Sequence, residues 1–184
     1  VVALIVGGSQ GSEALNNLLL AALDAVVAHR VNRPDHLHIL WSTGPRHHQR
    51  VNGALADLGS PDWVHSHPYF DNMPDALAAA DLTVSRAGAM FTAELLNQGL
   101  PAILVPFPNA AADHQTHNAR ALAEAGAALL TPQAGLTGEI LWAELNQLSG
   151  DPKSLERMGM AATSLARPRA ADQIAASVER LLAS

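Results

Sequence analysis

The sequence of 184 residues contains no cysteine, which excludes a disulfide framework, thiolate catalysis and cysteine-ligated zinc. Aromatic residues make up only 4% of the chain. The net charge of −6 argues against a general nucleic-acid binder, because such a protein needs a basic surface. No apolar run is long enough to span a membrane, since Asn16, Asn17 and Asp24 interrupt the best candidate at residues 15–27.

The residues that are present fit a globular domain. The apolar fraction of 48% is ordinary for a folded protein of this length with a substantial core. The first residues lack the basic segment of a signal peptide. The chain opens directly on an apolar strand pattern without an initiator Met and shows no internal linker. We therefore expect residues 1–184 to be one domain excised from a longer protein.

Short apolar runs alternate with helical patterns along the whole chain. The expected strands are Val1–Val6, Leu37–Trp41, Trp63–His65, Leu82–Ser85, Ala102–Pro106 and Ala127–Leu130. Several of these runs are continuously apolar, as in strands that are buried on both faces. Strand–helix alternation at this spacing predicts βαβ units with right-handed crossovers. We expect an α/β fold with a doubly wound, parallel six-stranded sheet, and ligands beyond the carboxyl ends of its strands.

Several residues predict where helices begin. Ser12 is a candidate N-cap for the amphipathic helix over residues 15–27, and Thr137 is a candidate N-cap for a later helix. Asp151 and Pro152 read as an N-cap followed by proline at the first helical position. Residues 137–182 are expected to be helical throughout.

The most informative segment is the turn and helix over residues 85–94. Small residues follow an apolar strand and open a helix pattern, so free backbone N–H groups and the positive end of the helix dipole suit a phosphate. Glu94, one helical turn later, offers carboxylate oxygens that suit sugar hydroxyls. A carboxylate in the first turns of a helix also has a purely stabilising interpretation.

A second turn of this kind spans residues 7–11, where glycines allow close backbone approach and Ser9 and Gln10 can donate to phosphate oxygens. A tight turn without a ligand is the alternative interpretation. Two phosphate-type turns in one domain predict a nucleotide diphosphate ligand. The turn does not match the GxGxxG fingerprint, and the second strand lacks a following acidic residue, which argues against a nicotinamide domain.

Two further polar loops follow expected strands. Tyr69 and Phe70 are adjacent aromatic residues that can stack on a base, although both rings can equally fill the core beneath a loop. Asp113 precedes an expected helix on which Gln115 and Asn118 share a face. This polar helix start suits sugar hydroxyls, and helix capping by Asp113 is the competing interpretation.

The histidines do not indicate a metal site. The pairs His36/His38 and His65/His67 each place two imidazoles on one face of a strand, but no convergent third ligand is evident. No GxSxG nucleophile motif is present. We therefore expect neither a metal centre nor a catalytic triad.

Three stretches taken together, residues 7–11, 85–101 and 105–119, closely resemble the C-terminal, donor-binding domain of the MurG family. These are peptidoglycan UDP-N-acetylglucosamine transferases of the GT-B fold, and the resemblance covers essentially the whole chain in order and spacing. It implies a Rossmann-like half of a GT-B glycosyltransferase. It also implies inverting transfer of N-acetylglucosamine from UDP-N-acetylglucosamine to undecaprenyl-pyrophosphoryl-muramyl-pentapeptide, which converts lipid I to lipid II.

By this resemblance, Ser9 contacts the donor, Tyr69 and the backbone of Phe70 lie near uracil, and residues 89–94 wrap the α-phosphate and ribose. Gln115 reads the N-acetylglucosamine hydroxyls. The implied substrate-binding residues are Ser9, Gln10, Tyr69, Phe70, Ala89, Met90, Phe91, Thr92, Ala93, Glu94, His114 and Gln115. Phe91 departs from the family, which often has a small hydroxyl residue at that position.

The resemblance further implies that no cofactor is used and that UDP-N-acetylglucosamine is the donor substrate. The general base, the lipid-linked acceptor site and the membrane-facing patch belong to an N-terminal domain outside this chain, so no catalytic residue is expected here. The full-length protein would lie at the cytoplasmic face of the bacterial plasma membrane and bind no nucleic acid. Alternatives are a UDP-sugar 2-epimerase, a lipid glycosyltransferase, or a non-catalytic UDP-sugar-binding subunit of a split glycosyltransferase.

Overall fold

A parallel β-sheet forms the centre of the computed structural model, which describes residues 1–182. Its strands are β1 (Val2–Val6), β2 (His38–Ser42), β3 (Val64–His67), β4 (Leu82–Ser85), β5 (Ala102–Leu104) and β6 (Ala128–Leu130). The spatial order is β3-β2-β1-β4-β5-β6, and every pair is parallel. The predicted doubly wound, parallel six-stranded sheet is confirmed.

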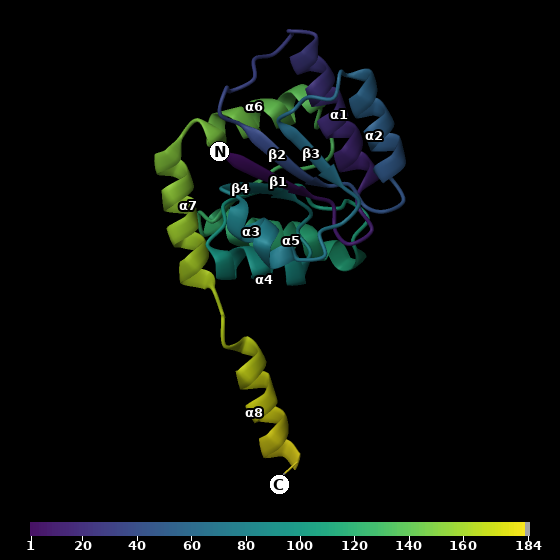
Figure 1. Cartoon of the computed structure of the whole chain (residues 1–184). Coiled ribbons are helices and arrows are strands. Elements are labelled where there is room, and N and C mark those ends of the chain that lie inside the picture. The colour runs from purple at the N-terminus through teal and green to yellow at the C-terminus, as the bar shows by residue number, and fades with distance from the viewer. Residues whose placement is uncertain (183–184) are drawn as a thin grey trace.

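Helices cover both faces of the sheet (Figure 1). They are α1 (Glu13–Val27), α2 (His48–Asp57), α3 (Met73–Ala79), α4 (Ala89–Gln98), α5 (His114–Glu124), α6 (Gly138–Ser149), α7 (Pro152–Leu165) and α8 (Ala170–Leu182), with a 3₁₀ turn at Ala111–Asp113 before α5. Helices α1, α2 and α6 lie on one face, and α3, α4 and α5 lie on the other. Helix α8 stands away from the domain, and none of its described residues is buried.

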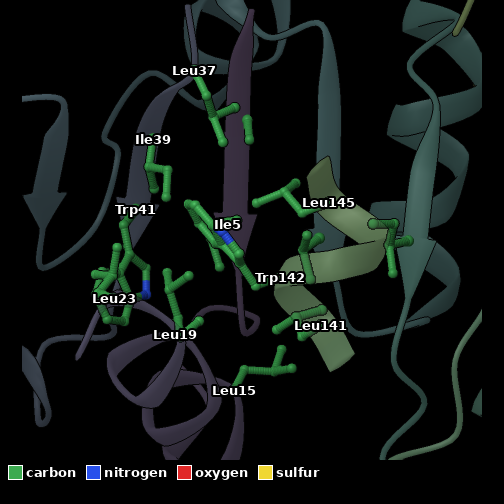
Figure 2. Packing of buried hydrophobic residues seen from close by; sticks show 14 of the residues in the cluster. Ile5, Leu15, Leu19, Leu23, Leu37, Ile39, Trp41, Leu141, Trp142 and Leu145 are labelled. Carbon is green, nitrogen blue, oxygen red and sulfur yellow. The ribbon is translucent and has the colours of Figure 1, made fainter. Parts of the chain in front are cut away.

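The face beneath α1, α2 and α6 holds the larger apolar cluster (Figure 2). Trp142 of α6 packs against Trp63 with ring centroids 5.9 Å apart. Trp41 of β2 donates from Nε1 to Oδ1 of Asn16 at 3.1 Å, and Asn16 donates in turn to the carbonyl of Thr43 at 2.8 Å. This buried chain of hydrogen bonds satisfies the indole and fixes α1 against the end of β2.

A smaller apolar cluster lies on the opposite face, beneath α3, α4 and α5. Its buried members are Leu4, Val6, Ala76, Leu77, Ala87, Leu95, Leu100, Ala102, Leu104, Ala119 and Ala128. Alternate residues of β1 therefore contribute to opposite clusters, as the period of a strand requires. With both faces covered, the continuously apolar strands are explained.

The predicted N-caps are confirmed. Ser12 Oγ accepts from the N–H of Leu15 at 3.3 Å, and Thr137 Oγ1 accepts from Ile140 at 3.2 Å. Asp151 Oδ1 accepts from the N–H of Ser154 at 3.0 Å. Hydrogen bonds from Ser154 hold the pKa of the Asp151 carboxyl below its usual value.

Some boundaries differ from the sequence-based expectation. Residues 137–182 are not one continuous helical segment, because interruptions of the helix before Pro152 and around Pro168 divide them into α6, α7 and α8. Strand β5 ends at Leu104, since Pro106 has no N–H with which to continue the ladder. Strand β3 is an edge strand, and its pairing with β2 alone sets its range to Val64–His67. Among residues 1–182, no helix is long and apolar enough to cross a membrane.

Candidate functional site

The site lies where the strand order reverses, at the carboxyl ends of β1 and β4. From β1 the sheet proceeds through β2 to β3 on one side, and from β4 it proceeds through β5 to β6 on the other. The loops that leave β1 and β4 therefore diverge and leave a crevice between them, which is the usual ligand position in an open parallel sheet. The glycine turn at residues 7–11 leaves β1, and residues 86–88 leave β4.

Two adjacent cavities occupy this crevice. The first, called cavity A, has a volume of about 560 Å³ and is lined by Gly7, Gly8, Gly11, Ser12, Glu13, Ala14, Arg86, Gly88, Phe91, Phe107, Gln115 and Gln133. The second, called cavity B, has a volume of about 440 Å³ and is lined by Val6, Gly8, Ser9, Tyr69, Met73, Gly88, Ala89, Met90, Phe91 and Glu94. Gly8, Gly88 and Phe91 line both, so the two cavities meet at the two turns.

Helix α4 begins at the junction of the cavities. Its N-cap residue is Gly88, which has extended backbone and provides no side-chain hydrogen bond to the helix. The first intrahelical bond runs from the N–H of Thr92 to the carbonyl of Gly88. The N–H groups of Ala89, Met90 and Phe91 thus precede the helical ladder, and they lie at the positive end of the helix dipole. This arrangement suits an anionic group at the junction.

The glycine turn is held in place by very close contact with the end of β2. Gly11 and Gly44 have φ values of +76° and +85°, which favour glycine. A Cβ on Gly11 would overlap the carbonyl of Thr43, and one on Gly44 would overlap the carbonyl of Gln10. Glycine is therefore required at both positions. The close contact that it allows holds the turn beside cavity A.

Arg86 is the most unusual side chain of the site. It is only 8% exposed, and among residues 1–182 its guanidinium has no carboxylate partner. Nη1 donates to the carbonyls of Val105 at 3.0 Å and Pro106 at 3.1 Å. Nη2 donates to Ser12 Oγ at 2.9 Å and to Gln133 Oε1 at 2.6 Å.

Burial lowers the pKa of Arg86, but an arginine remains protonated at neutral pH. All four of its hydrogen-bond acceptors are uncharged, so its positive charge is not cancelled by a neighbour. The guanidinium joins the loops after β4, β5 and β6 to the start of α1. It therefore orders the wall of cavity A and makes that wall electropositive.

Gln115 lies at the start of α5 and faces cavity A. Its Oε1 accepts from the backbone N–H of Ala87 at 3.2 Å and of Phe107 at 3.0 Å. Backbone N–H groups are donors only, so this pair of bonds fixes which end of the amide is the acceptor. Nε2 makes no hydrogen bond to any residue between 1 and 182, which leaves it as a donor for a ligand.

Asn118, predicted to share a face with Gln115, donates from Nδ2 to the carbonyl of Ala87 at 3.0 Å. The two amides together hold the turn after β4. Asp113 precedes α5 but makes no side-chain capping bond, so the interpretation of Asp113 as a side-chain cap is wrong. Its φ of 53° and that of Ala112, 48°, place two successive non-glycine residues in the left-handed region.

Glu94 and Tyr69 border cavity B. The carboxylate of Glu94 is exposed and has no hydrogen-bond or ion-pair partner in the part of the chain that the structure describes, so it is free to accept bonds from a ligand. The side chain of Tyr69 is 43% exposed. Cavity B thus combines an aromatic ring, apolar side chains and one carboxylate, a set that suits a nucleoside.

The structure brings together many of the site residues expected from the sequence. Those that line a cavity are Ser9, Tyr69, Ala89, Met90, Phe91, Glu94 and Gln115. The residues that line neither are Gln10, Phe70, Thr92, Ala93 and His114. Thr92 is buried, and its Oγ1 donates within α4. His114 contacts the carbonyl of Ala111 through Nδ1 at 2.7 Å, and the ring of Phe70 packs 5.0 Å from that of His67.

Comparison with known sequences identifies the chain. A sequence profile of the glycosyltransferase family 28 C-terminal domain matches residues 2–174. The chain belongs to this family. Within residues 1–182 of this family 28 domain, no cluster of three or more His, Cys, Asp or Glu side chains could hold a metal ion.

Individual named proteins show which members of the family this chain is similar to. A protein from Desulfitobacterium hafniense, named UDP-N-acetylglucosamine--N-acetylmuramyl-(pentapeptide) pyrophosphoryl-undecaprenol N-acetylglucosamine transferase, is 39% identical over 175 residues. The match covers 93% of this chain and 46% of that protein, so the chain spans about half the length of the curated relatives it matches. The crystal structure of Acinetobacter baumannii MurG has a TM-score of 0.83 at 32% identity, covering 98% of this chain and 52% of that one.

The predicted resemblance to the MurG family is therefore confirmed, as is the Rossmann-like fold of one GT-B half. A structure described as a putative UDP-N-acetylglucosamine 2-epimerase from Listeria monocytogenes has a TM-score of 0.67 at 15% identity. It covers 98% of this chain and 45% of that chain. At this identity the likeness shows a shared fold alone.

Sequence reasoning missed four residues that shape the site of the family 28 domain: Ser12, Arg86, Phe107 and Gln133. Arg86 carried a signal, because it is a charged residue among small ones directly after a buried strand. Gln133 carried none, since it meets Arg86 across 47 positions of sequence. Ser12 was correctly predicted as a cap, and it also accepts from Arg86.

Proposed function

We propose that this chain is the donor-binding domain of an inverting glycosyltransferase that uses UDP-N-acetylglucosamine. The observation that carries the proposal is the pair of cavities that meet at an uncapped helix start and a glycine turn. A sugar nucleotide has the same three parts in the same order: a nucleoside, a diphosphate and a sugar. The relatives that the chain matches over most of its length carry the name of such a transferase.

In this proposal the nucleoside occupies cavity B. Tyr69 lies beside the base, and Glu94 accepts hydrogen bonds from the ribose hydroxyls. The diphosphate crosses the junction at Gly8 and Gly88, where backbone N–H groups of the α4 start point toward it. The sugar enters cavity A, where Nε2 of Gln115 donates to one of its hydroxyls.

The chemistry that follows is displacement of UDP from the anomeric carbon. The 4-hydroxyl of the muramyl sugar on undecaprenyl-pyrophosphoryl-muramyl-pentapeptide attacks that carbon, and the bond to the diphosphate oxygen breaks. Negative charge grows on the departing UDP, and the fixed N–H groups and the positive potential near Arg86 stabilise it. The proton of the attacking hydroxyl passes to a base that this domain does not supply.

The acceptor site, the base and contact with the membrane belong, in this proposal, to the half of the relatives' length that the chain does not span. The protein that contains the domain would act peripherally at the cytoplasmic face of the plasma membrane. It would require no cofactor, and the product would be the lipid-linked disaccharide.

Isothermal titration calorimetry of this chain with UDP, GDP and NAD tests the donor assignment. We expect UDP to bind, weakly, and GDP and NAD to bind less well. A paired assay with a lipid-linked acceptor analogue should show no transfer by the chain alone. Tighter binding of NAD than of UDP would contradict the proposal, and release of free sugar from UDP-N-acetylglucosamine would point to a 2-epimerase instead.

A further inference from the structure

The phenyl rings of this chain gather at the ligand end of the sheet. Phe91 and Phe107 both line cavity A, and Phe91 also lines cavity B. Phe107 is 42% exposed. In a chain with only three phenylalanines, two on the wall of one polar crevice call for a physical explanation.

Both rings are held in place from behind. Phe91 is the third residue of α4 and packs against the apolar cluster beneath that helix. Phe107 donates its backbone N–H to Gln115, and the guanidinium carbon of Arg86 lies 5.5 Å from the centroid of its ring. A cation at this distance over an aromatic face is attracted to it. The rings are therefore ordered before any ligand arrives.

Cavity A consequently has two kinds of wall. The polar side chains are Ser12, Arg86, Gln115 and Gln133, with Glu13 at the rim. The apolar side chains are Ala14, Phe91 and Phe107. The hydroxyls of a hexose match the first wall, and the second is matched in part by the C–H face of the sugar ring and more completely by an apolar substituent. An N-acetyl sugar carries one, the methyl group of its acetamide, and a plain hexose does not.

We propose that Phe91 and Phe107 form an apolar subsite for the acetamido methyl group of the donor sugar. The pair is then a specificity determinant for 2-acetamido sugars, and neither ring takes part in bond making. This inference rests on the proposed function, since it assigns one group of the sugar nucleotide to one wall of cavity A. When two ligands differ by one methyl-sized group that fills an apolar pocket, the protein prefers the ligand that carries it by about tenfold or more.

The test measures affinities of UDP, UDP-glucose and UDP-N-acetylglucosamine for the whole chain by competition against a fluorescent UDP analogue. The variants are Phe107→Ala and Phe91→Ala, with Phe107→Leu as the conservative change. Met160→Ala is the control, because Met160 is an exposed apolar residue on α7 that lines neither cavity. Circular dichroism confirms that each variant is folded.

The unaltered chain should bind UDP-N-acetylglucosamine more tightly than UDP-glucose. Phe107→Ala should reduce the ratio of these two affinities by about tenfold. Phe107→Leu should retain part of it, and Met160→Ala should leave it unchanged. Phe91→Ala should reduce the ratio and also weaken UDP, because its ring borders both cavities. If the alanine variants weaken both sugar nucleotides equally, the rings contact the hexose ring itself and the inference is wrong.

Absence of any preference in the unaltered chain would overturn the inference in the same way. Failure of UDP to bind would instead contradict the proposed function, so the two failures are distinguishable. Should Phe107→Ala not fold, the ratio measured for Phe91→Ala and Phe107→Leu decides the outcome.

Discussion

The buried tryptophans and the phenyl rings at the ligand end of the sheet use aromatic side chains in opposite ways. Trp41, Trp63 and Trp142 are at most 6% exposed and lie in the cluster beneath α1, α2 and α6. Phe91 and Phe107 lie at the carboxyl end of the strands and border the cavities. The chain has few aromatic residues, so this division is informative.

The reason lies in the polar atom of the indole. The Nε1 groups of Trp41 and Trp142 donate to Asn16 Oδ1 at 3.1 Å and to the carbonyl of Asn32 at 2.9 Å, which fixes both rings in one orientation. A phenyl ring has no donor to satisfy, so it can remain half exposed at the edge of a cavity until a ligand covers it. Aromatic residues between the sheet and α1, α2 and α6 should therefore control stability, and those at the carboxyl end of the strands should control binding.

The largest effect is expected for Trp142→Ala, which removes a ring that is 1% exposed. The free energy of unfolding should fall by about 3–5 kcal/mol, the range for a buried large aromatic residue. Urea denaturation measures it, with Trp142→Phe as the milder control. UDP affinity of the folded variant should be unchanged, and a large loss of UDP affinity would break the proposed division between stability and binding.

Arg86 should contribute to both stability and binding, because it is buried like the core residues and also lines cavity A. Arg86→Met should lower the free energy of unfolding by about 2–3 kcal/mol, since buried acceptors lose a charged donor. UDP should bind more weakly by about tenfold or more, which corresponds to about 1.4 kcal/mol or more. Arg86→Lys keeps the charge without the planar fork, so it should restore UDP affinity more than stability. Unchanged UDP affinity in Arg86→Met would remove Arg86 from the donor site.

Glu94 belongs to the binding region alone. Glu94→Ala should weaken UDP by about 2 kcal/mol, as expected for charge-assisted hydrogen bonds to the ribose. The preference for UDP over 2′-deoxy-UDP should narrow, and the melting temperature should hardly move. Calorimetry with the two nucleotides measures both. An unchanged ratio between them would remove Glu94 from the ribose site, since Glu94 lies beyond the first turn of α4, where a carboxylate interacts with the helix dipole.

Gln115 allows stability and sugar recognition to be separated. Gln115→Ala removes the acceptor for two backbone N–H groups, so unfolding should become easier by about 1–2 kcal/mol. Gln115→Glu keeps an acceptor and removes the Nε2 donor. It should preserve stability but reduce the preference for UDP-N-acetylglucosamine over UDP-N-acetylgalactosamine by about 1 kcal/mol. If Gln115→Glu leaves that preference intact, the role of Gln115 is structural.

The smallest effect concerns pH. Burial, and secondarily the charge of His67, lower the pKa of His48 from its ordinary value of 6.5. The unfolded chain therefore binds the proton more readily, and the stability that the neutral ring contributes is present above pH 6.5. It is lost as the pH falls below 6.5 through the pKa of the folded chain.

Melting temperatures between pH 8 and pH 5, a window of about 1.5 units either side of the ordinary pKa, should show this dependence for the unaltered chain and less of it for His48→Gln. His117→Gln changes an exposed histidine of α5 and is the matched control. Parallel pH profiles for the unaltered chain and His48→Gln would contradict the assignment.

Local chemistry explains which features could be predicted from the sequence. Ser12, Thr137 and Asp151 cap the helices that follow them, because capping depends on residues three positions apart. The turns at residues 7–11 and 85–94 were recognised by their small residues and by the strand patterns before them. The helix start at Pro152 was predicted from Asp151 and Pro152, whereas the break before α8 was missed, although Pro168 marked its place.

The sequence by itself determined the alternation of strands and helices, the helix caps and the family, because these follow from short-range patterns. The tertiary structure alone decided that β1 and β4 are neighbours, that Arg86 joins Ser12 to Gln133, and that Gln115 holds two turns with one oxygen. Such contacts join positions far apart in the chain, and local propensity carries no information about them. Phe91 likewise lines both cavities because α4 begins at their junction, which depends on the position of α4 in the folded domain.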